Sequence, residues 1–328
     1  MSVGTRSPVE VDYRSGRVRG AGGIERCGIM MMQAAASVTL RLDIRGFSWA
    51  ARAISAALPS RSVVRVMLDD DCAFEMPYGD AYWSLLLLRN AEYEDDMHGV
   101  MEAIAPVDYA FVDCGANYGY WSVLVTGRRL GGHAAAAVEA APDTFAWLSR
   151  NAAANGGRFT AMNRAIGDRS GLRVPLYGTK HEARSVVGEH GARPIAEVET
   201  LALDDLLARP EFAGGKPIVL KLDVEGVEVA ALAGAPRMLE RDVLIAYEDH
   251  GMDRSHAASA HLAGNLGMRL FAFDRMTGRE IAALDELTAI KRHRWFGYNF
   301  FATRSPLWIA HLEPLCSGSA NATMRMEG

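Results

Sequence analysis

Two acidic residues each end an apolar run of the chain. Residues 109–127 read YAFVDCGANYGYWSVLVTG, so Asp113 stands before a turn with Gly115 and Gly119, and the next apolar run, AAAAVE, ends on Glu139. Glycines let a turn approach a ligand closely, and the free N–H groups of a following helix favour a negative group. An acid after the second run suits the two hydroxyls of a ribose. The pattern predicts a small-ligand site.

The type of ligand depends on the residues of this turn. A dinucleotide site has the pattern G-x-G-x-x-G, but Asn117 and Tyr120 stand where its second and third glycines belong. Asp113 would also repel a pyrophosphate. S-adenosylmethionine fits better, because its ammonium and sulfonium suit Asp113, its carboxylate suits the helix N–H groups and its diol suits Glu139. In the structural alternative, Asp113 only caps a helix and Glu139 is a solvated strand end.

A second group of candidates follows two later apolar runs. Side chains alternate along a strand, so Lys221, Asp223 and Glu225 in LKLDVEG would share one side, and YEDHG brings Glu248 and His250 to the same edge. We predict that Asp223 orients an acceptor hydroxyl or takes its proton, followed as candidates by Glu225 and His250. Alternatively, Asp223 is a structural hydrogen-bond acceptor and His250 a surface residue. These acids could ligate Mg²⁺, but magnesium leaves weak sequence traces and no metal site is predicted.

The composition argues against several classes of function. A net charge of -5 with interspersed signs disfavours a nucleic-acid partner. The four cysteines, Cys27, Cys72, Cys114 and Cys316, have no paired spacing, which disfavours zinc and disulfides and favours a reducing, cytoplasmic location. No run reaches the roughly 20 apolar residues of a membrane span. The expected partner is a small molecule or a glycan that offers a hydroxyl as acceptor, and the oligomeric state stays open.

The elements that must position these residues alternate between strand and helix. Strand-like runs occur at 109–114, 133–140, 158–167, 216–226, 242–251 and 268–274, with helix-like runs between most of them. Such alternation predicts an open, doubly wound, mostly parallel sheet, and ligands of such sheets sit at the carboxyl ends of the strands. The run YNFFATR, residues 298–304, is predicted to be an antiparallel edge strand that closes the sheet.

Several ordered stretches resemble the FkbM family of S-adenosylmethionine-dependent methyltransferases. The resemblance extends over about residues 80–304, and it rests on EYEDDMHGVM, FVDCGANYGYWSVL, VEAAPDTFAWLSRNAAANG, NRAIGDRSG, VETLALDDLL and IVLKLDVEGVEVAALAGAPRML. Ordered motifs are far more specific than a single glycine turn. The resemblance implies a class I methyltransferase fold, which is Rossmann-like, with a mostly parallel seven-stranded sheet whose last strand is antiparallel. It also implies methyl transfer, usually to a hydroxyl of a sugar or secondary metabolite.

The resemblance further implies roles for individual residues. Around the methionine part of the cofactor it places Asp113, Gly115 and Asn117, and on the ribose Glu139. The adenine contacts would be Ala165, Ile166 and Asp168. Cys114 departs from the family, which often has an aliphatic residue there, but a small buried thiol is an easy replacement.

The expected domain organisation has four parts. Residues 1–33 are expected to be disordered, so a chain that starts at Met30 should stay folded. Residues 34–105 would form a strand and helix extension, 106–305 the methyltransferase domain and 306–328 a C-terminal tail. Two other functions remain open: a dinucleotide-dependent oxidoreductase or sugar epimerase, and a catalytically inactive methyltransferase fold that binds a partner.

Overall fold

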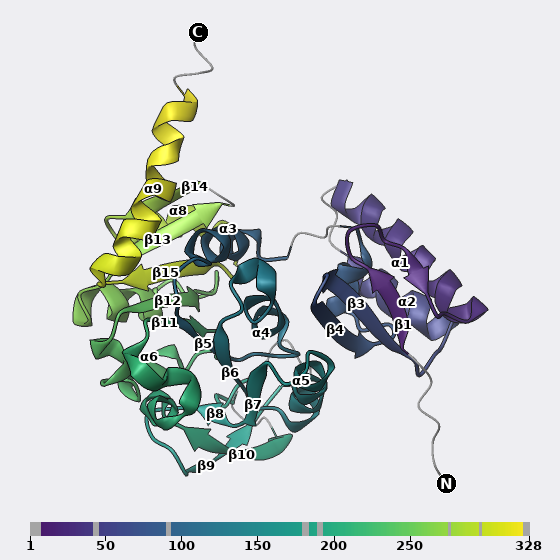
Figure 1. Cartoon of the computed structure of the whole chain (residues 1–328), viewed down its shortest axis with the longest axis horizontal. Helices are drawn as coiled ribbons and strands as arrows, with labels where there is room; N and C mark the ends of the chain where they lie inside the picture. Colours follow the sequence, from purple (N-terminus) through teal and green to yellow (C-terminus); the bar gives the residue numbers. More distant parts are fainter. Residues whose placement is uncertain are drawn as a thin grey trace. The chain divides into compact units, whose positions relative to one another are not determined.

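The chain divides into two units in its computed structural model (Figure 1). The structure describes residues 8–41, 46–89, 93–178, 184–188, 193–274, 277–294 and 297–323. The first unit comprises Met1–Tyr93 with Ala146–Gly157, and the second comprises Glu94–Phe145 with Arg158–Gly328. The division therefore falls twelve residues before the one expected at residue 106, and a piece of a later helix joins the first unit.

The first unit consists of a four-stranded sheet and the helices that follow its strands. Its sheet has the order β2 (Val18–Arg19), β1 (Val9–Asp12), β3 (Val63–Asp69) and β4 (Cys72–Pro77). The parallel strands β1 and β3 are connected through α1 (Gly23–Arg41) and α2 (Phe47–Ala57), and the 3₁₀ helix η1 (Trp83–Leu87) follows. On β3, Val64, Val66 and Leu68 are buried and their neighbours are half-buried, because successive side chains of a strand point to opposite faces.

The expectation of disorder at the N-terminus is wrong for residues 8–33. These residues form β1, β2 and the first half of α1, and Val9, Val11, Ile29 and Met32 are buried. The composition of this segment wrongly indicated disorder, because β1 is only four residues long and is stabilised by pairing with β3, more than fifty residues later. Residues 1–7 lie outside the described part of the chain.

Two asparagines complete the outer edge of strand β4. They lie at the end of α5 (Pro142–Ala154), on the part that belongs to the first unit. Asn155 accepts the N–H of Ala73 through Oδ1 at 2.9 Å and donates Nδ2 to the Ala73 carbonyl at 2.6 Å. Asn151 pairs with Glu75 in the same way, at 2.6 and 3.0 Å. The amides therefore satisfy backbone groups that an edge strand would leave unpaired.

The second unit is built on an eight-stranded mixed sheet. Its spatial order is β14 (Thr277–Ile281), β13 (Arg269–Asp274), β15 (Asn299–Thr303), β12 (Val243–Glu248), β11 (Ile218–Leu222), β5 (Ala110–Cys114), β6 (Ala134–Glu139) and β7 (Phe159–Asn163). The five strands from β12 to β7 are parallel, and the other three pair antiparallel. All residues of β5 and β11 are buried, which requires cover on both faces of the sheet.

The predicted mostly parallel sheet is confirmed, but its strand count and its edge are not. The structure has an eighth strand, β14, which forms a hairpin with β13. Strand β15, expected at the edge, lies between β12 and β13. Strand order is decided by pairings between distant segments, which the local pattern does not contain.

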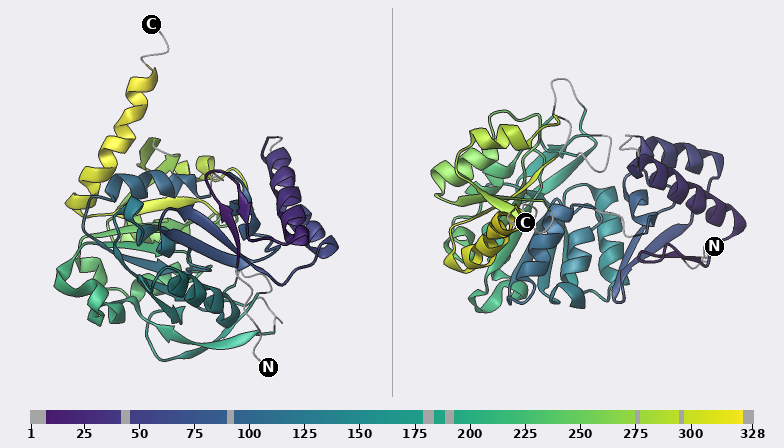
Figure 2. Two further views of the ribbon diagram at one scale, coloured as in Figure 1. Left: turned by 45° about the vertical axis from the view of Figure 1, so that its right-hand side comes forward. Right: turned by 90° about the horizontal axis from the view of Figure 1, so that it is seen from above.

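The remaining elements surround this sheet (Figures 1 and 2). The helices are α3 (Asp95–Ile104), α4 (Tyr120–Val125), α6 (Glu228–Ala233), α7 (Ala257–Ala260), α8 (Asp285–Ile290) and α9 (Pro306–Thr323). The short 3₁₀ helices are η2 (Arg128–Leu130), η3 (Leu203–Ala208), η4 (Pro210–Gly215) and η5 (Met238–Glu240), and the π-helical turn is η6 (His261–Asn265). A second, small sheet has the order β8 (Ala165–Ile166), β10 (Ala196–Leu201) and β9 (Arg173–Leu176).

The segment from residue 306, which was expected to be a tail, forms the helix α9 as far as Thr323. In α9, Trp308 is fully buried and donates Nε1 to the Asp242 carbonyl at 2.9 Å, and Leu312 is also buried. Residues 324–328 lie outside the described part. None of the described helices combines the length and apolar character needed to cross a bilayer.

Candidate functional site

The acids predicted from the sequence gather where the strand order reverses. The chain runs from β5 outward to β7 and then returns to β11 on the other side of β5. In open α/β sheets the crevice beyond the carboxyl ends of two such strands is the usual ligand site. Asp113 is the last residue but one of β5 and Asp223 follows β11, so both stand at this crevice. Glu139 ends β6 and Glu248 ends β12 at the same edge.

Asp113 is buried with an unsatisfied oxygen. Its side chain is 1% exposed, and its Oδ2 accepts the hydroxyl of Ser122 at 2.6 Å. Its Oδ1 accepts no hydrogen bond from any residue that the structure describes. Burial raises the pKa of Asp113, although the nearby charge of Lys221 opposes the shift. A buried acceptor without a partner is costly unless a ligand satisfies it.

The turn after β5 brings two strand ends into contact at Gly115. Gly115 has φ +73°, and a Cβ built on it would lie 1.7 Å from the carbonyl oxygen of Asp223. The Asp223 N–H donates to the Cys114 carbonyl at 3.1 Å. A glycine is therefore required here by both backbone conformation and space. The left-handed conformation continues at Asn117, with φ 51°, which asparagine tolerates better than most residues.

Glu139 is held by backbone N–H groups of two loops. Its Oε2 accepts the N–H of Asn117 at 2.9 Å, and its Oε1 accepts the N–H of Ala141 at 2.8 Å. Burial raises the pKa of Glu139 to about 7, although these two hydrogen bonds oppose the shift. Each carboxylate oxygen retains a further lone pair, so this fixed group can still accept two hydroxyls of a diol.

Lys221 is a buried cation among acids. Its Nζ lies 2.8 Å from Oδ2 of Asp223, and its side chain is 7% exposed. Burial opposes its charge, but Asp223, Glu94 and Asp113 outweigh burial and raise the pKa of Lys221. The sequence placed Lys221 on this face without a role. Glu94 was missed, because it comes from the turn before α3 and no local pattern relates it to β11.

Glu94 is positioned by a tryptophan of α4. Trp121 Nε1 donates to Oε2 of Glu94 at 2.5 Å, and Glu94 has a left-handed backbone with φ 48°. Burial raises the pKa of Glu94 to about 7, and the charge of Lys221 opposes the shift. The stretch EYEDD was part of the family resemblance, which was the only available signal for this residue.

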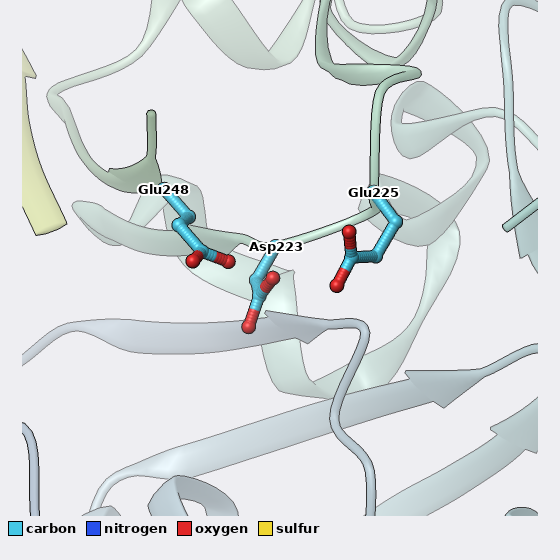
Figure 3. A group of neighbouring side chains, drawn as sticks. All are labelled: Asp223, Glu225 and Glu248. Atoms are coloured by element: carbon cyan, nitrogen blue, oxygen red, sulfur yellow. The ribbon is translucent and has the colours of Figure 1, made fainter. Parts of the chain in front are cut away.

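Three carboxyl groups converge beyond β11 and β12 (Figure 3). Glu225 and Glu248 point toward Asp223 from either side, and one oxygen from each lies within 4.8 Å of the others. Burial raises the pKa of Glu225 to about 7, with help from the charge of Asp223. Burial and Asp223 also raise the pKa of Glu248, so we assign the proton of this close pair to Glu248. Burial opposes the charge of Asp223, but Lys221 lowers its pKa. The three acids could also hold a divalent cation.

A cavity of 340 Å³ opens beside these acids. Its lining includes Glu225, Glu248 and His250, so the three lie around one space. His250 is half-buried, and its Nδ1 accepts the N–H of Met252 at 3.2 Å. No hydrogen bond in the described part of the chain links His250 to Asp223.

The loop after β12 is fixed by a buried lysine that the sequence analysis missed. Lys291 is 0% exposed and bonds the carboxylate of Asp249, the Asp253 carbonyl at 2.5 Å and Nδ1 of His256 at 2.9 Å. An ammonium group only donates, so His256 accepts at Nδ1 and carries its proton on Nε2, facing Thr288 at 3.1 Å. These bonds fix the chain segment that carries Glu248 and His250.

Among the residues that the structure describes, the three implied adenine contacts make no hydrogen bond or ion pair with the acids at the strand ends. Ala165 and Ile166 are buried on β8, and Ile166 belongs to the hydrophobic core. Asp168 is half-exposed and pairs with Arg169 at 3.2 Å. No hydrogen bond within the described ranges connects Asp168 to Glu139.

The fold and the site define a class of protein. A mostly parallel sheet with a glycine turn and carboxylates at its switch point is typical of enzymes that bind a cofactor containing a nucleoside. Residues 113–268 match the family described as Methyltransferase FkbM domain. The family predicted from the sequence is thereby confirmed.

Other comparisons give weaker similarity. A solved FkbM methyltransferase from Methylobacillus flagellatus KT is 17% identical, with a TM-score of 0.38, and the match covers 60% of this chain and 43% of that one. This chain therefore matches less than half of that protein's length. A precorrin-6y C5,15-methyltransferase from Geobacter metallireducens GS-15 is 13% identical, with a TM-score of 0.36 and coverage of 63% and 85%. No curated protein sequence matches the chain.

Proposed function

We propose that this protein transfers a methyl group from S-adenosylmethionine to a hydroxyl of a sugar precursor or secondary metabolite. The proposal rests chiefly on Asp113, whose buried Oδ1 lacks a partner among the described residues. It lies beside a glycine turn at the switch point of the sheet. A cationic group of the cofactor would satisfy this oxygen, because carboxylates bind cations through strong charge-assisted hydrogen bonds.

The other residues of the site fit the same cofactor. Gly115 has no Cβ, so the turn can pack closely on the backbone of Asp223 and both strand ends can face one ligand. Glu139, with both oxygens already oriented by backbone N–H groups, would accept the hydroxyls of the ribose. Asn117 would contact the methionine part. Asp168, which is exposed, would accept a hydrogen bond from the adenine amine, next to Ala165 and Ile166.

The protein's part in the reaction is alignment and proton removal. When bound, S-adenosylmethionine supplies a methyl group already activated by a positively charged sulfur. We assign proton removal to Glu225. Its carboxyl group makes no hydrogen bond or ion pair with the described residues, and its pKa of about 7 suits a base at neutral pH. Asp223, held by Lys221 with a lowered pKa, would orient the acceptor hydroxyl. This order of roles differs from the one expected from the sequence.

The lining of the cavity beside the acids indicates what charge the acceptor can carry. Glu225, Glu228, Glu248, Asp249 and Asp253 all line it. Glu248 holds a proton and Asp249 is paired with Lys291, so the negative charge of the lining comes from the other three acids. Like charges repel, so a phosphorylated or carboxylated acceptor would be disfavoured there. A neutral polyol or an amino sugar has hydroxyl or amine donors for these carboxylates. We therefore propose an acceptor without a negative charge near its reacting hydroxyl.

Cofactor binding is tested first, without any acceptor. S-adenosylhomocysteine at about 100 times its Kd should stabilise the folded protein by about 2.7 kcal/mol. Calorimetry should show this binding in the wild type and in Glu240→Ala, which removes an exposed acid, but much weaker binding in Glu139→Ala. Tight NADH binding without S-adenosylhomocysteine binding would favour the oxidoreductase alternative.

The reaction is tested by mass spectrometry. Neutral sugars, amino sugars and hydroxylated metabolites are incubated with the protein and methyl-labelled S-adenosylmethionine. The proposal expects one labelled methyl on a hydroxyl oxygen. Cofactor binding without methylation of any acceptor tried would favour the inactive binding protein, and label on nitrogen or carbon would reject O-methylation.

A further inference from the structure

Helix α1 of the first unit is apolar on two opposite faces. Its inner face includes Ile29, Met32 and Ala36, each 0% exposed. On its outer side, Ile24, Met30, Met31 and Val38 are 53%, 59%, 48% and 55% exposed. A surface helix of a soluble protein normally has one apolar stripe, and a helix that is apolar all round is normally covered by other structure.

The outer residues have the spacing of a helix-packing seam. Ile24, Cys27, Met31, Ala34 and Val38 follow one another at intervals of three, four, three and four residues, and all are exposed. This alternation keeps side chains on one narrow line along a helix, where they can pack into gaps between the side chains of a partner helix. The spacing therefore points to a helical partner.

The neighbouring helix also exposes a large apolar side chain. Helices α1 and α2 pack side by side (Figure 2). On α2, Ala51 is buried and Trp49 is 75% exposed. Two residues correspond to about 200° around a helix, so Trp49 points away from the core of the unit, as the α1 seam does. We call these residues, Ile24, Cys27, Met30, Met31, Ala34, Val38 and Trp49, the outer face.

The charge of this region argues for a second copy rather than an oppositely charged partner or a membrane. Glu25 is turned inward and accepts the hydroxyls of Ser60 and Ser62. Among the described side chains of α1 and α2, the exposed charges are Arg26 and Arg52. A nearly uncharged surface is compatible with itself across a twofold axis. Helices that lie on membranes usually carry many lysines and arginines.

The size of the outer face also suits a dimer. Helix α1 has 19 residues and is therefore about 28 Å long. With α2 beside it, the face is about 20 Å wide and has an area of about 560 Å² per copy, which is below the roughly 800 Å² per partner of a standard interface and suits a weak, reversible dimer. We propose that a second copy of this chain packs on the outer face, with the α1 seams of the two copies in contact across a twofold axis.

The test is the oligomeric state of the full chain. Sedimentation and light scattering from about 0.1 to 50 µM should show a reversible dimer. Met31→Glu puts a charge into both halves of the interface and should raise the dimer Kd at least about 100-fold. The control, Leu172→Glu, changes a 45% exposed residue of the second unit and should leave the dimer intact. If Met31→Glu fails to fold, Trp49→Ser gives the second measurement, with a weakened dimer expected.

Three results would overturn the proposal. One is a monomeric wild type over the whole range. Another is a dimer that Met31→Glu and Trp49→Ser leave unchanged, which would place the interface elsewhere. The third is a monomer that pellets with phosphatidylglycerol vesicles and is released by Met31→Glu, which would make the outer face a membrane contact. None of these results depends on cofactor binding, so they leave the proposed function untouched.

Discussion

The ammonium group of Lys221 lies 2.8 Å from the carboxylate of Asp223, two residues later on the same side of the chain. Lys221 is the partner of Asp113 in the register of β11 and β5. One buried cation therefore compensates acids that come from different elements, including Glu94. Without it, the buried Asp113 and the partly exposed Asp223 would be left without a cation beside them.

Replacement of this cation should destabilise the fold. Lys221→Met should lower the free energy of unfolding by about 3 kcal/mol, since removal of one partner leaves buried carboxylates uncompensated. Urea unfolding at pH 7 measures this. The double variant Lys221→Met/Asp223→Asn should recover part of the loss. An unchanged midpoint in the single variant would mean that the pair contributes nothing to stability.

Glu225 should make stability depend on pH. Its pKa is about 7 in the folded protein and near 4.5 when unfolded. The folded state therefore binds more protons between these values, and stability falls as pH rises from about 4.5 to 7. Glu225→Gln cannot titrate and so lacks this loss of stability. The free energy of unfolding of the variant should therefore exceed that of the wild type by near zero at pH 4.5 and by about 1–3 kcal/mol above pH 7. Equal pH profiles for the two proteins would contradict the raised pKa.

Gly115 should tolerate no side chain, whereas an equally left-handed glycine elsewhere should. Gly115→Ala puts a Cβ 1.7 Å from the Asp223 carbonyl oxygen, so the two strand ends must separate. We expect the free energy of unfolding to fall by at least about 3 kcal/mol and the binding of S-adenosylhomocysteine to be lost. The control is Gly214→Ala, where φ is +74° but no atom lies within 4 Å of the new Cβ. This control substitution should lower the free energy of unfolding by only about 1 kcal/mol. Similar losses in both variants would mean that conformation alone, not the contact, requires glycine.

A chain that starts at Met30 should lose its first unit, contrary to the expectation from composition. The deletion removes β1 and β2 and the first residues of α1, and it exposes the β3 edge that β1 covers. Limited proteolysis should cleave the truncated chain rapidly between residues 31 and 89, while full-length protein resists. Equal resistance in the two proteins would mean that β1 is dispensable.

The acids of the site were predictable because each ends a strand-like run. Parallel strands bring their carboxyl ends to one edge, so the sequence alone predicts that Asp113, Glu139, Asp223 and Glu248 lie near one another. Glu94 and Lys291 could not, because each comes from a loop remote in sequence from the group that it contacts. The protonation state of each acid was also not predictable from the sequence, because it depends on burial and on the charge of Lys221.

The sequence by itself determined the alternation of strands and helices, the glycine turn and the family of residues 113–268, because these depend on local spacing and residue type. Only the tertiary structure decided that residues 8–33 are ordered, that β15 is interior, and that Asp223 is held by a cation while Glu225 is not. Each of these outcomes follows from contacts between segments far apart in the chain. Their free energies depend on burial and distance, which a linear pattern does not record.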